Sequence, residues 1–146
     1  MFVAGLAFLF VACTSNGQEL RAIKKEIEKD NALYFSLFNK KDTAIVNLYT
    51  GDGCLLAPNA PAICGKSALT RDFKDTYAAG QIKGVRFSSI DVYGDGTSYV
   101  TEEGTWQVLD KNDRVIDAGK YLKLWKKTKQ GWKIFRDVFN SDRKTP

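Results

Sequence analysis

Two carboxylic acids in the second half of the chain, Glu102 and Asp137, are the side chains best suited to acid–base chemistry. The chain has no histidine, so the residue that most often moves protons at neutral pH, and most often binds metals, is absent. Proton transfer would therefore fall to Asp, Glu, Lys, Tyr or Cys. A carboxylic acid in apolar surroundings has a raised pKa, which suits a general base. We therefore take Glu102 and Asp137 as the candidate catalytic residues.

Strand alternation predicts which side chains share a face with each acid. Because successive side chains of a strand point to opposite faces, Glu102, Gly104 and Trp106 share one face. The absence of a side chain at Gly104 leaves room beside Trp106. Unbroken alternation along the last strand places Asp137 and Phe139 together, and we expect both to point inward.

The alternative role of Asp137 is structural. Its carboxylate would then pair with Lys120, Arg136 or another cation and hold neighbouring strands together. The two roles predict different surroundings. A carboxylate that faces an apolar cavity without a cationic partner favours catalysis, whereas one held in a salt bridge favours a binding or structural role.

Aromatic and polar residues near these acids are the candidate lining of a pocket. Tyrosine hydroxyls can donate hydrogen bonds to a ligand, although a buried tyrosine more often belongs to the core and bonds within the protein. Trp106 is expected to form a pocket wall, whereas Trp125 and Trp132 are expected to pack. The candidate ligand contacts are Tyr49, Tyr77, Trp106, Tyr121, Phe139 and Asn140.

No metal, cofactor or nucleic acid is expected as a partner. The three cysteines have no CxxC-type spacing, so they do not form a recognisable zinc motif. The net charge is +5, and the excess lies in a late run of lysines. We interpret this run as a solvated hairpin rather than a nucleic-acid footprint, because no nucleic-acid-binding motif accompanies it. The lysines are Lys120, Lys123, Lys126, Lys127, Lys129 and Lys133.

Residues 1–17 are predicted to be a signal segment and tether, followed by one domain at 18–143 and a tail at 144–146. Residues 1–13 are almost entirely apolar but too short to span a bilayer. The stretch from Leu9 to Cys13 resembles a bacterial lipobox, which implies a lipid on Cys13 and an exported lipoprotein facing the periplasm or cell surface. A plain cleaved signal or a buried N-terminal segment remains the alternative. If Cys13 carries lipid, Cys54 and Cys64 remain as a pair, either a disulfide or two half-buried thiols.

The helices and strands that position these residues can be predicted from the spacing of apolar residues and from the glycines that interrupt it. Helical spacing of apolar residues predicts a long first helix, a short second one and a third opened by Gly65-Lys66 and ended by Gly80. Alternation and hairpin turns then predict four long antiparallel strands that curl. Helices before strands give an α+β domain. The helices are expected at 18–41, 42–49 and 66–79, a short strand at 54–57, and the long strands at 85–93, 98–109, 115–126 and 132–140.

Several segments together resemble the SnoaL-like and DUF4440-type branch of the nuclear-transport-factor-2-like (NTF2-like) superfamily. The resemblance implies a cone in which a curved antiparallel sheet packs on three N-terminal helices, with a pocket at the wide end and its inner face carrying Glu102. It also implies a homodimer formed through the outer sheet face. The segments are Asn47–Pro61, Gly65-Lys66, Glu102–Trp106, Gly119–Tyr121, Trp125–Lys127 and Trp132–Asn140.

Three functions remain open, because this fold serves many chemistries. The first is an exported domain that binds a small apolar molecule or acts as an assembly module, attached to a membrane only through lipid. The second is an isomerase, hydrolase or cyclase of the ketosteroid isomerase type that uses Asp137 or Glu102 as its base. The third is a structural dimer whose pocket is filled by its own side chains, such as Phe35, Phe38 and Phe73.

Overall fold

The computed structural model describes residues 16–143. The predicted third helix has the observed bounds, and each long strand is within a few residues of its prediction. The elements in chain order are helix α1 (Asn16–Asn39), 3₁₀ helix η1 (Thr43–Leu48), strands β1 (Tyr49–Leu56) and β2 (Ile63–Cys64), helix α2 (Lys66–Ala79), and strands β3 (Ile82–Gly94), β4 (Tyr99–Asp110), β5 (Val115–Thr128) and β6 (Gly131–Ser141).

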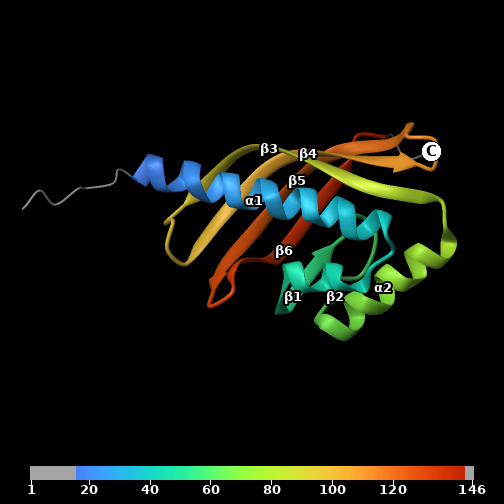
Figure 1. Ribbon diagram of the computed structural model, residues 1–146, viewed down its shortest axis with the longest axis horizontal. Helices are drawn as coiled ribbons and strands as arrows, with labels where there is room; N and C mark the ends of the chain where they lie inside the picture. Colours follow the sequence, from blue (N-terminus) through green and yellow to red (C-terminus); the bar gives the residue numbers. More distant parts are fainter. Residues whose placement is uncertain (1–15, 144–146) are drawn as a thin grey trace, which may run out of the picture.

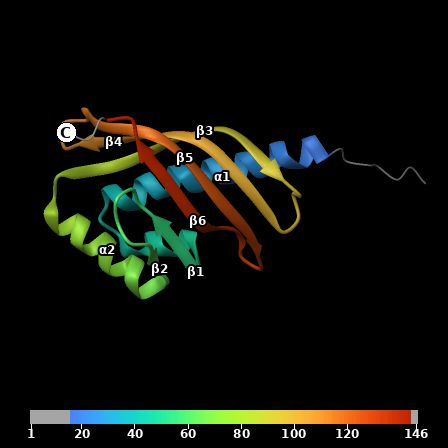
Figure 2. The ribbon, with the colours of Figure 1, turned by 180° about the vertical axis from the view of Figure 1, so that it is seen from behind.

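One curved sheet holds the six strands in the order β2-β1-β6-β5-β4-β3. Helix α1 runs obliquely across one face of β3–β6, and α2 lies with β1 and β2 at the end where α1 finishes (Figure 1). The opposite face of β3–β6 is open (Figure 2). Helices that cover one face of a curled sheet confirm the predicted α+β cone.

The first edge of the sheet differs from the prediction. The short strand was expected only at 54–57, but β1 already begins at Tyr49 and contains Gly51-Asp52-Gly53. Strand β1 pairs in parallel with β6, so the sheet is mixed rather than wholly antiparallel. The register shifts between Tyr49 and Cys54, which accommodates the two glycines as an irregularity instead of a strand end.

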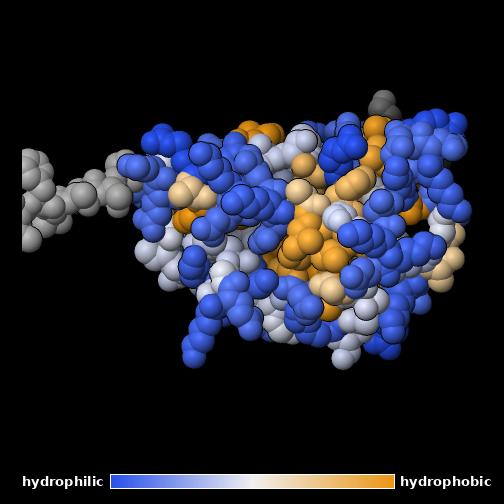
Figure 3. Space-filling model, viewed as in Figure 1, coloured by the Kyte–Doolittle hydropathy of each residue, from blue (hydrophilic) through white to orange (hydrophobic). Residues whose placement is uncertain are grey.

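An apolar stripe of α1 and the rings of α2 form the core above the sheet. Ile27 is fully buried and Tyr34 and Phe38 are nearly so, which follows from their spacing along one helical face. Phe38 meets Tyr77 of α2 edge to face, with ring centroids 5.2 Å apart. In the view of Figure 3 most of the surface is hydrophilic, with an apolar area over the C-terminal half of α1.

Alternation along β6 is interrupted once, which changes one sequence expectation. The pairing of β5 with β6 shifts between Leu124 and Trp125, so Ile134 and Asp137 are both buried although they are three residues apart. Phe135 is the bulged residue, because it has no directly opposed partner on β5. The unbroken alternation that we expected from the sequence is therefore wrong for the first half of β6, because a bulge resets the direction of the side chains.

Apolar side chains are exposed on the long strands. Leu122 and Val138 are directly opposed on β5 and β6, and 49% and 42% of their surfaces are accessible. Ile90 and Tyr93 of β3 are also exposed. The homodimer implied by the family resemblance stays a prediction.

A disulfide fastens the edge strand β2 to β1. Cys54 and Cys64 are directly opposed residues of the two strands, and their sulfur atoms are bonded. Cys13, the expected lipidation site, lies outside the described residues. No helix within 16–143 is long and apolar enough to cross a membrane.

Replacing both bonded cysteines should weaken the fold moderately. The disulfide closes a short loop of 10-residue separation, and loops of this size stabilise a protein by about 2–3 kcal/mol. We expect Cys54→Ser with Cys64→Ser to lower the free energy of unfolding in urea by that amount. Adding a reductant should lower the stability of the parent protein to that of the variant and leave the variant unchanged. Equal stability of parent and variant would contradict a native disulfide.

Candidate functional site

Three ionisable side chains lie in one row across the inside of the sheet. Glu102 of β4 is directly opposed to Lys123 of β5, and Lys123 is directly opposed to Asp137 of β6. The accessible fractions are 0%, 0% and 3%, so all three are removed from water. Burial of charge is costly unless the groups are paired or hydrogen-bonded, so the partners of each decide what it can do.

Glu102 is fully occupied by hydrogen-bond donors. Its Oε1 accepts bonds from Asn31 Nδ2 at 2.7 Å and from the Tyr121 hydroxyl at 2.6 Å. Its Oε2 accepts the indole N–H of Trp125 at 3.0 Å. A carboxylate held by three donors has little capacity left to bond a substrate. The structure therefore gives Glu102 the surroundings of a positioning residue.

Lys123 is the residue of this row that sequence analysis missed. We counted it among the solvated lysines, and that interpretation is wrong for this residue because β5 directs it inward beside Tyr121. Its Nζ donates to Asn31 Oδ1 at 3.1 Å and lies 3.2 Å from the centroid of the Phe87 ring. Burial lowers the pKa of Lys123, while the charges of Asp137 and Glu102 act to raise it. The sequence signal for its burial was strand alternation, which places Lys123 on the same face of the strand as Gly119 and Tyr121.

Asp137 keeps a free oxygen. The Tyr49 hydroxyl donates to its Oδ2 at 3.0 Å, and no other donor within residues 16–143 bonds the carboxylate. Burial raises the pKa of Asp137, Lys123 and the Tyr49 hydrogen bond oppose that rise, and Glu102 adds to it. A buried carboxylate with a raised pKa and one unbonded oxygen can accept a hydrogen bond or a proton from a ligand.

The cations that we expected as partners of Asp137 bond elsewhere. Lys120 pairs with Asp142 on the surface. Arg136 Nη1 donates to the backbone oxygens of Asp52 at 3.1 Å and Phe135 at 2.7 Å. No ion pair holds Asp137 in the part of the chain that the structure describes, although Lys123 is its neighbour across the sheet.

A mostly apolar cavity of about 270 Å³ lies between the helices and the sheet, with Asp137 in its wall. Its volume is close to the lower end of the range for small-molecule sites. Phe38 and Phe73 form walls of this cavity and do not fill it. The purely structural dimer requires a pocket filled by such side chains, so the cavity does not support that function. The lining residues are Tyr34, Phe38, Leu55, Asp72, Phe73, Thr76, Ile82, Val85, Phe87, Trp106, Val108, Asp117, Asp137 and Phe139.

The six candidate ligand contacts differ in how they are placed relative to this cavity. Trp106 and Phe139 line the cavity, with ring centroids 5.4 Å apart. Tyr49 reaches it only through its hydrogen bond to Asp137. The remaining contacts, Tyr77, Tyr121 and Asn140, do not line this cavity.

The side chains of these three residues have other surroundings. Tyr77 donates its hydroxyl to the backbone oxygen of Asp42 at 3.3 Å, and burial raises the pKa of Tyr77 to about 12. Tyr121 is bonded to Glu102 and occupies the room that Gly104 leaves, so the protein itself fills the space that we expected to be free. Asn140 is exposed, because it follows the inward Phe139 and alternation turns it outward.

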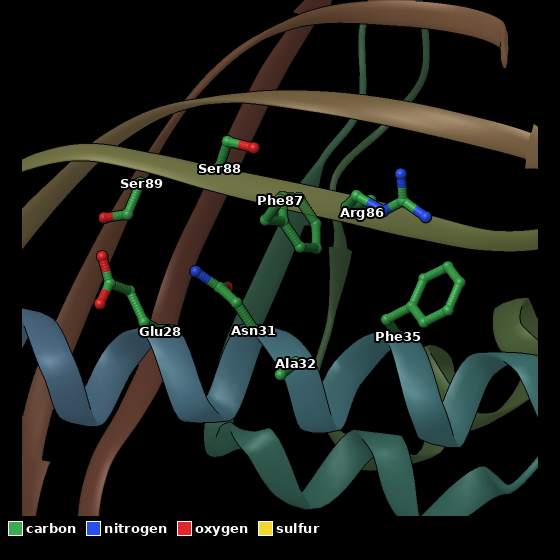
Figure 4. A pocket seen from close by; sticks show the side chains of 8 residues that line it. All are labelled: Glu28, Asn31, Ala32, Phe35, Arg86, Phe87, Ser88 and Ser89. Atoms are coloured by element: carbon green, nitrogen blue, oxygen red, sulfur yellow. The ribbon is translucent and has the colours of Figure 1, made fainter.

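A second, more open hollow of about 490 Å³ lies between α1 and β3. Figure 4 shows Glu28 opposite Ser89 at one end and Arg86 beside Phe35 at the other. Glu28 and Arg86 are exposed, so their charges are largely screened by water. The smaller cavity is the better candidate site, because it is more apolar and contains a buried carboxylate.

Residues 16–143 contain no cluster of three Cys, Asp or Glu side chains that could hold a metal ion. Among the described residues that line the cavity there is likewise no glycine-rich loop that could bind a nucleotide phosphate. The cavity offers the buried carboxylate of Asp137, the less buried carboxylates of Asp72 and Asp117, aromatic walls and the hydroxyl of Thr76.

No family model matches the chain, and no curated protein matches it. Solved structures do. A ketosteroid isomerase-like protein from Erwinia carotovora atroseptica is 21% identical, with a TM-score of 0.65 over 87% of this chain and 98% of that one. An NTF2-like superfamily protein from Salmonella enterica serovar Typhimurium is 17% identical, with a TM-score of 0.65 over 86% and 95%. The chain has the NTF2-like fold.

A protein of unknown function from Mycobacterium tuberculosis has the same architecture. It is 19% identical, with a TM-score of 0.75 over 91% of this chain and 79% of that one. At such identities similarity shows the fold alone, and NTF2-like proteins differ in what they do. The function of this chain therefore has to be argued from its own cavity.

The buried Asp137 should make stability fall as pH rises. Because its folded pKa is raised above the unfolded value near 3.8, the folded protein holds this proton longer than the unfolded chain does. The quantity to measure is the unfolding free energy of the parent minus that of Asp137→Asn. This difference should decrease as pH rises from about 3.8 to the raised folded pKa, and it should be constant above that pKa. Urea unfolding of both proteins from pH 3 to 8 measures the difference. A difference that increases with pH would mean that the attraction of Lys123 outweighs burial.

Removing the buried ammonium should be costly. We expect Lys123→Met to lower the free energy of unfolding by about 3–5 kcal/mol, because Glu102 and Asp137 lose the buried cation that lies between them on β5. Lys123→Met with Glu102→Gln should recover part of that loss, and the hairpin control Lys129→Met should change stability by about 0.5 kcal/mol or less. Chemical unfolding measures all three. Equal stability of Lys123→Met and the parent would refute the charge coupling.

Proposed function

We propose that this chain is an exported protein that binds a small, largely apolar molecule in the cavity between α1, α2 and the sheet. The observation that carries the proposal is the state of Asp137. It is 3% exposed, lines an apolar cavity of about 270 Å³, and is bonded through only one of its oxygens. A ligand that donates one hydrogen bond to Oδ1 would satisfy the carboxylate and cover apolar walls at the same time.

A second candidate function is catalysis at the same place. Asp137 faces the cavity without an ion pair among residues 16–143, and burial raises its pKa. Both properties suit a general base that removes a proton from an apolar substrate. The Tyr49 hydroxyl, which bonds Asp137 Oδ2, would orient the carboxylate. An isomerase, hydrolase or cyclase of the ketosteroid isomerase type is the corresponding class, and the motif resemblance to the SnoaL-like and DUF4440-type branch supports it.

We place the protein outside the cytoplasm, as a lipoprotein anchored through Cys13. The lipobox-like sequence supports the anchor. The disulfide between Cys54 and Cys64 supports the compartment, because disulfides persist in exported proteins and are rare in reducing cytosol. Mass spectrometry of the protein isolated from its own membranes tests both points through the added lipid mass.

Filling the cavity should abolish binding. We expect the neutral fluorescent molecule N-phenyl-1-naphthylamine to bind the parent protein, and Val108→Phe to weaken this binding at least about tenfold because the new ring occupies the cavity. Val138→Phe is the matched control, since Val138 is exposed and does not line the cavity. Fluorescence titration measures affinity, and circular dichroism checks that both variants fold.

Two outcomes would decide between the alternatives. Equal binding by the two phenylalanine variants would place the ligand elsewhere and refute the proposal. Native mass spectrometry of protein purified gently from its producing cell then shows whether a small molecule is retained. If such a molecule is converted by the parent protein but not by Asp137→Asn, catalysis becomes the better description.

A further inference from the structure

We propose that the molecule bound in this cavity is a small apolar amine in its protonated form, with its ammonium group beside Asp72 and its apolar part against the aromatic walls. The inference rests on the proposed function, because it assigns a chemical class to the ligand of the same cavity.

Six of the residues that line the cavity are aromatic. The face of an aromatic ring is negative, so it attracts a cation as well as excluding water. Rings from the helices α1 and α2 and from the strands β3, β4 and β6 surround the same space, so a bound cation would have aromatic rings on several sides. The rings are those of Tyr34, Phe38, Phe73, Phe87, Trp106 and Phe139.

Every charged side chain that lines the cavity is acidic. Asp72 of α2, Asp117 of β5 and Asp137 of β6 contribute carboxylates, and no Lys or Arg is among the lining residues from the described chain. The protein as a whole has a net charge of +5, so this sign is opposite to that of the average surface. Such a cavity disfavours an anionic ligand and favours a cation.

Asp72 is the carboxylate with no partner of its own. It is half-buried on α2, one turn before Thr76, and bonds no side chain and no backbone donor between residues 16 and 143. Burial and then the charge of Asp75 raise the pKa of Asp72. Burial removes part of the water that would hydrate the Asp72 carboxylate. The N–H groups of a ligand ammonium ion would take the place of that water, so a cation binds there favourably.

Asp117 differs from Asp72 because protein groups already bond it. Its Oδ1 accepts bonds from the Ser141 hydroxyl at 2.7 Å and the Ala118 N–H at 2.8 Å, and Arg143 Nε lies 3.7 Å away. Its charge is therefore partly compensated. Asp72 is left as the stronger attraction for a ligand cation.

Asp72 and Asp137 act on the same part of the cavity. Burial raises the pKa of Tyr34 well above its usual value, and the charges of Asp137 and, more weakly, Asp72 add to the rise. Tyr34 is itself a lining residue, so both carboxylates lie near one wall. An ammonium group beside Asp72 can therefore also face the unbonded oxygen of Asp137, while the apolar part of the ligand packs against the rings.

The buried Lys123 lies next to this cavity, with its Nζ 3.2 Å from the centroid of the lining Phe87 ring and 5.6 Å from that of Tyr34, so a bound cation requires that the charge of Lys123 is balanced. Lys123 is not a lining residue, its Nζ is bonded to Asn31, and the Phe87 ring lies against it. Its charge is also balanced locally, because Glu102 and Asp137 are its neighbours on the two adjacent strands. With both acids ionised, the row has one negative charge in excess.

Three compounds of similar size and different charge test the inference. 2-Phenylethylamine, 2-phenylethanol and 3-phenylpropionate are titrated at pH 7 as competitors of N-phenyl-1-naphthylamine, and their affinities are measured by calorimetry. We expect the amine to bind about tenfold more tightly than the alcohol, since a charged hydrogen bond contributes enough free energy for one order of magnitude. The carboxylate should bind most weakly.

A matched pair of variants locates the attraction. Asp72→Asn keeps the shape of the side chain and removes its charge, and we expect it to reduce the preference for amine over alcohol about fivefold or more. Asp75→Asn removes the same charge three residues away on α2, from an exposed residue that does not line the cavity, and should keep the preference. Equal losses in both variants would indicate only general electrostatics and overturn the assignment to Asp72.

The remaining outcomes separate this inference from the proposed function. If N-phenyl-1-naphthylamine binds and Val108→Phe blocks it, but the amine binds no better than the alcohol or none of the three compounds competes, the amine inference is overturned and the cavity remains a binding site. If N-phenyl-1-naphthylamine does not bind the parent protein at all, both proposals are overturned.

Discussion

The interaction on which the rest of the structure depends is the buried row of charges across β4, β5 and β6. Glu102, Lys123 and Asp137 are opposed in register, so the ammonium lies between two carboxylates. Buried charges must be compensated by partners, and here Asn31, from α1, bonds both Glu102 and Lys123. This polar contact fixes where the long helix lies on an otherwise apolar sheet face, because any shift along the sheet would leave a buried charge unpaired.

The row also explains why Asp137 differs from Glu102 although both are inward acids of one sheet. Glu102 is surrounded by three donors, whereas Asp137 has the Tyr49 hydroxyl and one unbonded oxygen. Lys123 can compensate one negative charge, so the second acid keeps part of its desolvation cost. That residual cost is what a ligand in the adjacent cavity can relieve, and it connects the packing of the core with the proposed binding function.

Much of the fold could be predicted, and the errors have local physical causes. Helix α2 and the long strands follow from periodicity and from glycine-containing breaks. The stretch Gly51-Asp52-Gly53 was misjudged because its pairing partner, β6, is more than 75 residues later in the chain. The bulge at Phe135 was missed because a register shift depends on the neighbouring strand. Lys123 was misjudged because lysine is seldom buried, and only its partners make burial tolerable.

The sequence by itself determined the α+β class and the order of the elements, because helical and strand periods are local properties. Which face of the sheet is the inner one was an expectation from the family resemblance, and the burial of Glu102 and Asp137 agrees with it. Only the tertiary structure decided which of these acids retains a free oxygen, which lysine is buried, and that Asp72 of α2 shares a cavity with Asp137. Hydrogen-bond partners, burial and the position of a helix beside a sheet arise from contacts between segments far apart in the chain, and local patterns do not encode them.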